Sequence, residues 1–98
     1  MAQRMGNRNH VLNVLGRNVR RQREESKLTQ EALGERANLD PTYISGIERG
    51  VRNPSVLSVI RIAKALRVTT SKLMENVDDE LLEHANTREP ASRQTKRV

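Results

Sequence analysis

The sequence contains no cysteine, no phenylalanine and no tryptophan, and it has a single tyrosine. The absence of cysteine excludes disulfides and thiolate metal sites, so a reducing cytoplasm is the natural environment. No apolar run approaches the ~20 residues that are needed to cross a bilayer. Residues 1–10 are polar and carry no apolar stretch of the kind that forms a secretory signal. We therefore expect a cytoplasmic protein.

The chain has 98 residues, which is enough for one compact core. Because aromatic side chains are nearly absent, this core has to be built from Leu, Ile, Val, Ala and Met, and such residues at helical spacing favour a small helix bundle. We predict an all-α fold of five or six helices over residues 11–85. A flexible basic tail (residues 1–10) is expected before it, and a disordered basic tail (residues 86–98) after it.

Positive charge is spread unevenly along the chain. Lys and Arg outnumber Asp and Glu by 18 to 12, which gives a formal net charge of +6. Residues 11–74 hold 12 basic and 6 acidic side chains, whereas residues 75–85 hold five acidic side chains and no Lys or Arg. A basic body with one acidic segment fits a protein that turns one face toward phosphate. An ordinary charged surface explains these totals equally well.

Apolar spacing divides the folded region into helices. The first is expected over residues 11–25, with Leu12, Leu15 and Val19 on its buried side and Arg23, unusually for a charge, on the same side. The next three helices are expected at residues 30–37, 41–49 and 56–66. A fifth helix is expected to contain Leu73 and Met74, and residues 78–85 are expected to extend it or to form a short sixth helix.

Capping residues support these boundaries. Thr29 and Ser55 are suited to cap the second and fourth helices, Asp40-Pro41 is a strong start for the third, and Gly50 stops it. On the fourth helix we expect one face to be buried and a second to be left uncovered. The buried face consists of Val56, Val59, Ile62, Ala63 and Leu66, and the uncovered one of Leu57 and Ile60.

The second and third helices are joined by a turn of about three residues, 38–40, which is the spacing of a helix-turn-helix. In this motif one helix crosses the DNA backbone while the next enters the major groove. Residues that enter the groove have to be small or polar and must not be needed in the core. With Ile44 and Ile47 pointing inward, the outer face of the third helix is expected to carry Thr42, Tyr43, Ser45, Gly46 and Arg49.

Four runs of sequence carry a resemblance to a known family. They are LTQEAL at residues 28–33, YISGIERG at 43–50, RNPS at 52–55 and IAKAL at 62–66. In this order and spacing, residues 16–74 resemble the phage repressor and Cro-type (XRE-like) helix-turn-helix family, whose fold is a lambda-repressor-like bundle. The YISGIERG run with the following Arg-Asn-Pro is similar to the controller proteins of restriction–modification systems, and it also occurs in many other small regulators.

The resemblance implies roles for the matching residues. Thr42 falls at the family's main base-reading position, and Ser45, Gly46 and Arg52 are further base-reading candidates. Pro41 stands where many members have a long polar reader, which puts a base contact there in doubt. Contacts to the DNA backbone are implied for Thr29, Gln30, Tyr43, Arg49 and Asn53. The alternatives are an ordinary polar face for Thr42 and Ser45, a core role for the Tyr43 ring, and a plain surface charge for Arg52.

Arg23 and Glu48 match a pair that the family buries as an ion pair between the first helix and the end of the third. This would explain the charge on the apolar side of the first helix, and it makes the two residues structural. Arg67 stands where relatives often have glycine after the fourth helix, so we expect some strain in the turn before Val68.

The second half of the chain has more apolar residues than one small core needs, and an exposed apolar patch is usually an interface. One recognition helix reads too few base pairs for a unique site, whereas a two-fold dimer reads two half-sites about 10–10.5 bp apart. We therefore expect a homodimer on a near-palindromic operator, unless this face packs only within its own chain. The expected dimer contacts are Leu57, Ile60, Leu73, Met74, Val77 and Leu81.

Catalytic, metal and cofactor sites are not expected. His10 and His84 have no Cys or spaced His partner, and the acidic residues between 75 and 85 lack the glycine and spacing of a calcium loop. There is no glycine-rich phosphate cradle and no nucleophile–base arrangement.

The sequence thus predicts a bacterial or phage DNA-binding regulator associated with the nucleoid. It would repress by occupying a promoter or activate by contacting RNA polymerase. The alternative is an antitoxin-type interaction module whose tail, residues 86–98, folds on a partner protein.

Overall fold

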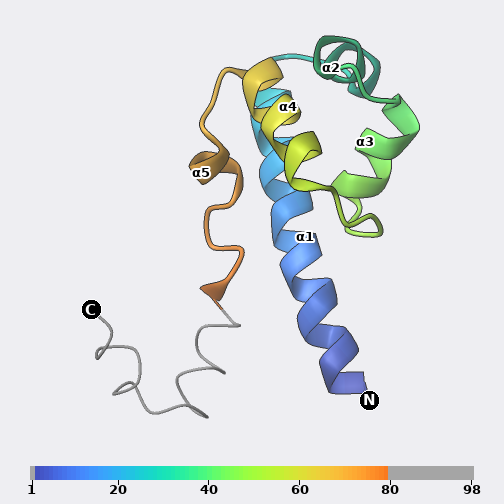
Figure 1. The fold of residues 1–98 in the computed structure, drawn as a ribbon, viewed down its shortest axis with the longest axis vertical. Helices are drawn as coiled ribbons and strands as arrows, with labels where there is room; N and C mark the ends of the chain where they lie inside the picture. The colour runs from blue at the N-terminus through green and yellow to red at the C-terminus, as the bar shows by residue number, and fades with distance from the viewer. Residues whose placement is uncertain (1, 80–98) are drawn as a thin grey trace.

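The computed structural model describes the backbone of residues 2–79 and the side chains of residues 10–79. These residues form α1 (Ala2–Glu25), α2 (Gln30–Ala37), α3 (Pro41–Glu48), α4 (Val56–Leu66) and α5 (Thr70–Leu73), and no strand occurs among them (Figure 1). The all-α prediction is therefore confirmed. None of these helices is both long and apolar enough to cross a membrane.

The first helix is longer than expected, because it begins at Ala2 and not near Val11. Its N-terminal part extends beyond the other helices (Figure 1). The prediction of a tail over residues 1–10 rested on missing apolar periodicity. Apolar periodicity indicates which residues are buried and does not indicate where a helix ends. A helix that is already formed within the bundle can extend further, because each added residue gains one hydrogen bond. Residues 2–10 contain no proline that would stop it.

The core lies between α1 on one side and α2, α3 and α4 on the other. α1 packs against α3, α4 and α5, and α2 packs against α3 and α4. The expected inward residues of α1 (Leu12, Leu15 and Val19) are buried, as are Ile44 and Ile47 of α3. The other members of the core include Leu33, Ala37, Ile62, Ala63 and Leu66. The aliphatic core inferred from the lack of aromatic residues is confirmed.

The caps agree with the sequence. Oγ1 of Thr29 accepts a hydrogen bond from the backbone N–H of Ala32 at 3.0 Å, and the Asp40 carboxylate accepts one from Thr42 at 2.8 Å. Gly50 has φ +79°, a left-handed conformation that glycine adopts without steric cost, and it ends α3. Arg67 ends α4 with φ 60°, so the expected strain is present at a residue that carries a side chain.

α5 is fixed to α1 by Asn18. Its side-chain amide donates hydrogen bonds to the carbonyl oxygens of Leu73 at 2.7 Å and Glu75 at 2.9 Å. Leu73 and Val77 are buried in the core, so their assignment to the dimer contact is wrong. Asn18 holds this segment on α1, so both side chains pack within their own chain. Leu81, most of the possible sixth helix and the tail of residues 86–98 lie outside the described residues.

α4 also differs from the expectation at its first residue. Val56 is 77% exposed and does not join the buried face with Ile62, Ala63 and Leu66. As the first residue after the Ser55 cap, it lies at the end of the helix, where the neighbouring helices no longer cover it. Leu57 and Ile60 are exposed as predicted.

Candidate nucleic-acid interface

α3 presents a polar outer face while two isoleucines hold it from behind. Ile44 and Ile47 are fully buried against the core, and Thr42 and Arg49 are exposed on the other side. Ser45 lies half-buried between them, and its hydroxyl accepts a hydrogen bond from Nε of Arg49 at 3.4 Å. Three of the five residues expected outside therefore share one accessible strip.

A charged network under the end of α3 fixes its position. Nε of Arg23 donates to Glu48 Oε2 at 2.6 Å and its Nη2 donates to Oε1 at 3.0 Å, so the pair is bidentate. Arg23 Nη1 also donates to the Leu28 carbonyl at 2.7 Å, and Gln30 Nε2 donates to Glu48 Oε1 at 3.0 Å. One carboxylate on α3 thus binds side chains from both α1 and α2.

This ion pair is largely shielded from solvent, with exposed side-chain fractions of 12% for Arg23 and 3% for Glu48. The hydrogen bonds to Glu48 raise the pKa of the Arg23 guanidinium, against the opposing effect of burial. An arginine is already charged at every ordinary pH, so this shift does not change the charge of Arg23. The buried pair inferred from the resemblance is present.

Gly46 does not lie on the outer face, and this expectation is wrong. The residue is buried beneath Arg52, whose Cγ would lie 2.5 Å from a Cβ added to Gly46. The backbone N–H groups of Val51 and Arg52 donate to the Gly46 carbonyl at 3.0 and 3.2 Å, which folds the segment after α3 back over the helix. The missing side chain makes room for the stem of Arg52.

The Arg52 guanidinium continues across α3 to the tyrosine. It lies 5.8 Å from the centroid of the Tyr43 ring, within the range of a cation–π contact. The half-buried Tyr43 ring packs against the core, and its hydroxyl lies 3.3 Å from Oγ of Ser58. Tyr43 therefore has a structural role, as the alternative interpretation held, and it supports an exposed arginine beside the outer face of α3.

Ser58 is the residue that sequence reasoning missed. It is buried, although serine is usually exposed, and its Oγ also lies 3.0 Å from that of Ser55. The two serines are three residues apart at the start of α4, a spacing typical of capping interactions. That signal indicates a local bond, but it does not reveal the contact with Tyr43 on another helix.

The remaining candidates surround α3. Thr29 is exposed at the start of α2, and Asn53 is exposed in the segment before α4. Gln30 is half-buried, and its side-chain amide supports α3 through the hydrogen bond to Glu48. It is also the first residue of α2, where free backbone N–H groups favour the binding of anions. Pro41 occupies the first turn of α3 and has no N–H to donate.

Comparison with known proteins identifies this arrangement. Residues 19–73 match the profile of a helix-turn-helix family. The chain belongs to this helix-turn-helix family. It is a DNA-binding transcriptional regulator, and the prediction of that function is confirmed.

Three relatives illustrate the similarity. The chain is 40% identical over 68 residues to control protein C.BamHI of Bacillus amyloliquefaciens, covering 68% of this chain and 84% of that one. It is 39% identical over 64 residues to control protein C.SmaI of Serratia marcescens, covering 65% and 76%. The restriction–modification controller protein C.Esp1396I, solved as a tetramer with its natural 35 base-pair operator, superposes with a TM-score of 0.63 at 39% identity, covering 74% and 95%.

Proposed function

We propose that this helix-turn-helix protein binds a near-palindromic operator as a homodimer and reads each half-site by placing α3 in the major groove. The observation that carries this proposal is the exposed polar strip of α3, anchored from behind by Ile44, Ile47 and the Glu48 network. A major groove about 12 Å wide admits one helix. An anchored helix with short polar side chains approaches base edges without losing core contacts.

Thr42, Ser45 and Arg52 are the proposed base-reading residues. Thr42 is exposed in the first turn of α3, the part of a recognition helix that reaches deepest into the groove. Arg52 is held over Tyr43, and a guanidinium suits the two acceptors of a guanine. Gly46, with no side chain and covered by Arg52, is no longer a candidate. Thr29, Gln30, Arg49 and Asn53 are proposed to contact the backbone, whereas Tyr43 is proposed to support Arg52.

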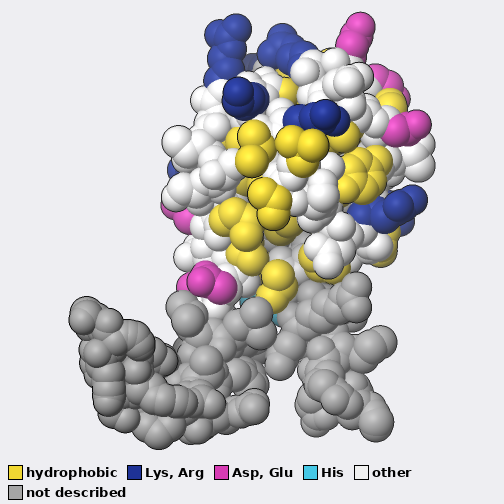
Figure 2. Space-filling view, in the orientation of Figure 1, with side chains coloured by type: hydrophobic (Ala, Val, Ile, Leu, Met, Phe, Trp, Pro, Cys, Tyr) yellow, Lys and Arg dark blue, Asp and Glu magenta, His cyan; other side chains and the backbone are white. Residues whose placement is uncertain are grey.

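The dimer is proposed to form through the outer face of α4 and the adjoining α5. Val56, Leu57, Ile60 and Met74 are exposed apolar residues on this face, and hydrophobic side chains gather in the centre of the view in Figure 2. A groove of about 370 Å³ between α1, α4 and α5 continues the patch inward. Exposed apolar area of this kind marks interaction sites on small proteins.

Selection of bound sequences from a random DNA pool, followed by footprinting, tests the proposal. We expect a site with two related halves whose centres are about 10–10.5 bp apart. A selected site without symmetry, bound by one chain per duplex, would contradict the dimer. Failure to select any site would contradict sequence-specific reading by α3.

A role as the controller of a restriction–modification operon is proposed on the similarity to C.BamHI and C.SmaI. The selected sequence should then lie upstream of the protein's own gene and next to genes for a methyltransferase or an endonuclease. A reporter under that promoter should respond to the protein in cells, by repression at an overlapping site or by activation through RNA polymerase. An operator far from such genes would contradict the controller role while leaving the regulator role intact.

A further inference from the structure

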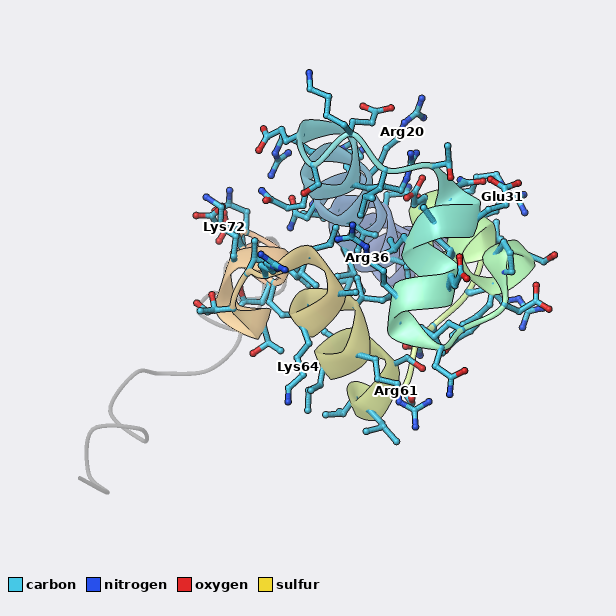
Figure 3. All side chains as sticks on the ribbon, turned by 90° about the horizontal axis from the view of Figure 1, so that it is seen from above. Arg20, Glu31, Arg36, Arg61, Lys64 and Lys72 are labelled. Carbon is cyan, nitrogen blue, oxygen red and sulfur yellow. The ribbon has the colours of Figure 1, made fainter. Side chains whose placement is uncertain are left out.

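A second cluster of positive charge lies away from α3, between the end of α2 and the exposed side of α4. Arg36, Arg61 and Lys64 line one open pocket of about 260 Å³, together with Ala37, Asn38 and Ala65. Figure 3 labels the three cations, with Arg36 on α2 and the other two on α4. No residue of α3 or of the segment 49–53 lines this pocket, so it is separate from the candidate DNA-reading surface.

Within residues 10–79 the three cations have no counter-ion. Among the described residues, none of them forms a hydrogen bond or ion pair, whereas Arg20, Arg23 and Lys72 each pair with a glutamate. The acidic side chains of α2, Glu31 and Glu35, line a different pocket with Asp40. α2 therefore separates a face of carboxylates from a face of cations.

Helix termini explain only part of this cluster. Arg36 and Lys64 lie in the last turns of α2 and α4, where the helix dipole stabilises a positive charge. Arg61 lies in the middle of α4, one turn from Lys64, and like charges at this spacing repel each other. The whole stretch from residue 49 to residue 74 contains six Lys or Arg and no Asp or Glu. Nothing within it offsets the repulsion.

We propose that this pocket binds phosphate groups. Two guanidiniums, one ammonium and the Asn38 carboxamide supply donors from the end of α2 and from α4, and guanidinium suits the oxygens of phosphate. The alanines at positions 37 and 65 leave the space between the donors open. The volume is slightly below the range of pockets that hold whole small molecules, so it fits a phosphate or diphosphate group. The natural source is a free phosphorylated small molecule or the backbone of a nucleic acid.

The test compares two variants of the full-length protein that lose the same charge. The test variant, Arg61→Gln with Lys64→Gln, removes two of the cations that line the pocket. The control variant, Arg20→Gln with Lys72→Gln, removes two cations that lie elsewhere in Figure 3 and already have glutamate partners. Titration with inorganic pyrophosphate should show a loss of affinity of about tenfold or more in the first variant only, because bonds to charged groups are strong. The exposed positions leave the fold intact, which a melting curve verifies.

A second measurement locates the anion and its source. Pyrophosphate should shift the NMR signal of the Asn38 side-chain amide and leave that of Asn53 unchanged. If a nucleic acid is the natural source, the slope of log affinity against log salt for a non-operator duplex should fall by about two in the first variant. If a free anion is the source, that slope should stay at the control's value while the pyrophosphate affinity falls.

The proposal is overturned if the two variants bind both pyrophosphate and duplex alike, or if pyrophosphate shifts Asn53 and not Asn38. Neither result affects the reading of an operator by α3, because the first variant retains every proposed base-reading residue. The selected operator of that variant should be the same as that of the unaltered protein. A changed operator would count against the separation of the pocket from the reading surface.

Discussion

α3 and α4 are neighbouring helices that begin alike, each at a capping side chain, and yet present opposite surfaces to solvent. The outer side of α3 is polar, with Thr42 and Arg49 exposed, whereas the outer side of α4 exposes Leu57 and Ile60. Their supports differ as well. α3 rests on isoleucines and on the Glu48 network, and α4 rests on the apolar core and the Ser58 contact.

This difference matches the two tasks proposed for these helices, DNA reading by α3 and association by α4. Hydrophobic contacts hold both helices in place, and the bidentate ion pair under α3 adds bonds of defined direction. A helix that reads base edges needs a defined orientation, and α3 has the polar bonds that supply it. The contact proposed between α4 and another copy is apolar and does not require such bonds.

The largest effect is expected from removing the support of α3. Arg23→Met should lower the free energy of unfolding by about 3–5 kcal/mol, because Glu48 stays buried without its partner. The double variant Arg23→Met with Glu48→Met should recover most of this loss, since an apolar pair of similar volume is tolerated. Urea denaturation measures both values. The exposed pair Arg20–Glu24 is the control, and Glu24→Ala should cost less than about 1 kcal/mol.

A charge on the apolar face of α4 should act on association and not on folding. Ile60→Asp is expected to weaken the dimer by about 2–4 kcal/mol, as for a central interface residue, while the melting temperature of the dilute monomer changes little. Sedimentation equilibrium measures the association. Val51→Asp is a matched control, since Val51 is also exposed and apolar but lies outside α4. If both variants associate equally well, the dimer contact lies outside this face of α4.

Truncation on the face of α3 should affect DNA binding alone. Thr42→Ala and Arg52→Ala are each expected to weaken operator binding by about 1–3 kcal/mol if they contact bases, with random DNA bound nearly as before. Fluorescence anisotropy on the selected operator and on a scrambled duplex measures the ratio. If both duplexes lose affinity equally, the altered residue contacts the backbone and does not read sequence.

The smallest effect concerns the space that Arg52 occupies. Gly46→Ala places a methyl group where the Arg52 stem lies and should displace that side chain from Tyr43. We expect operator binding to weaken by about 1 kcal/mol, while alanine's better helix propensity offsets part of any packing loss. Measuring unfolding and binding on the same sample separates the two effects. Unchanged binding would mean that Arg52 reads DNA from another position or not at all.

The sequence predicted most of the fold because its signals were local. Caps at Thr29, Asp40 and Ser55 and the stop at Gly50 act within one turn of helix, and the structure confirms each of them. The long α1 was not predicted, because a helix that continues past the bundle needs no apolar stripe. The Arg23–Glu48 pair spans 25 residues and was found only through the family resemblance.

The errors at the site came from contacts between elements. Gly46 was expected outside because only Ile44 and Ile47 were assigned to the inner side of α3, and the path of residues 51–52 over α3 covers it. Leu73 and Val77 were expected in a dimer contact because the apolar residues seemed too many for one core. Asn18 draws the α5 segment onto α1 and uses that surplus within the chain. Which residues read bases, and which join two copies, are still predictions.

Anchoring and outward residues alternate along α3, and this interleaving bears on how such regulators diversify. Ile44, Ile47 and Glu48 attach the helix to its scaffold, whereas Thr42 and Arg49 are exposed and Ser45 is half-buried on the other side. The residues on the outer side can therefore be substituted without disturbing the contacts that hold the helix. A library randomised at Thr42, Ser45 and Arg49 should yield folded proteins with new operator preferences. The same fold can therefore come to recognise a different operator through a few codon changes.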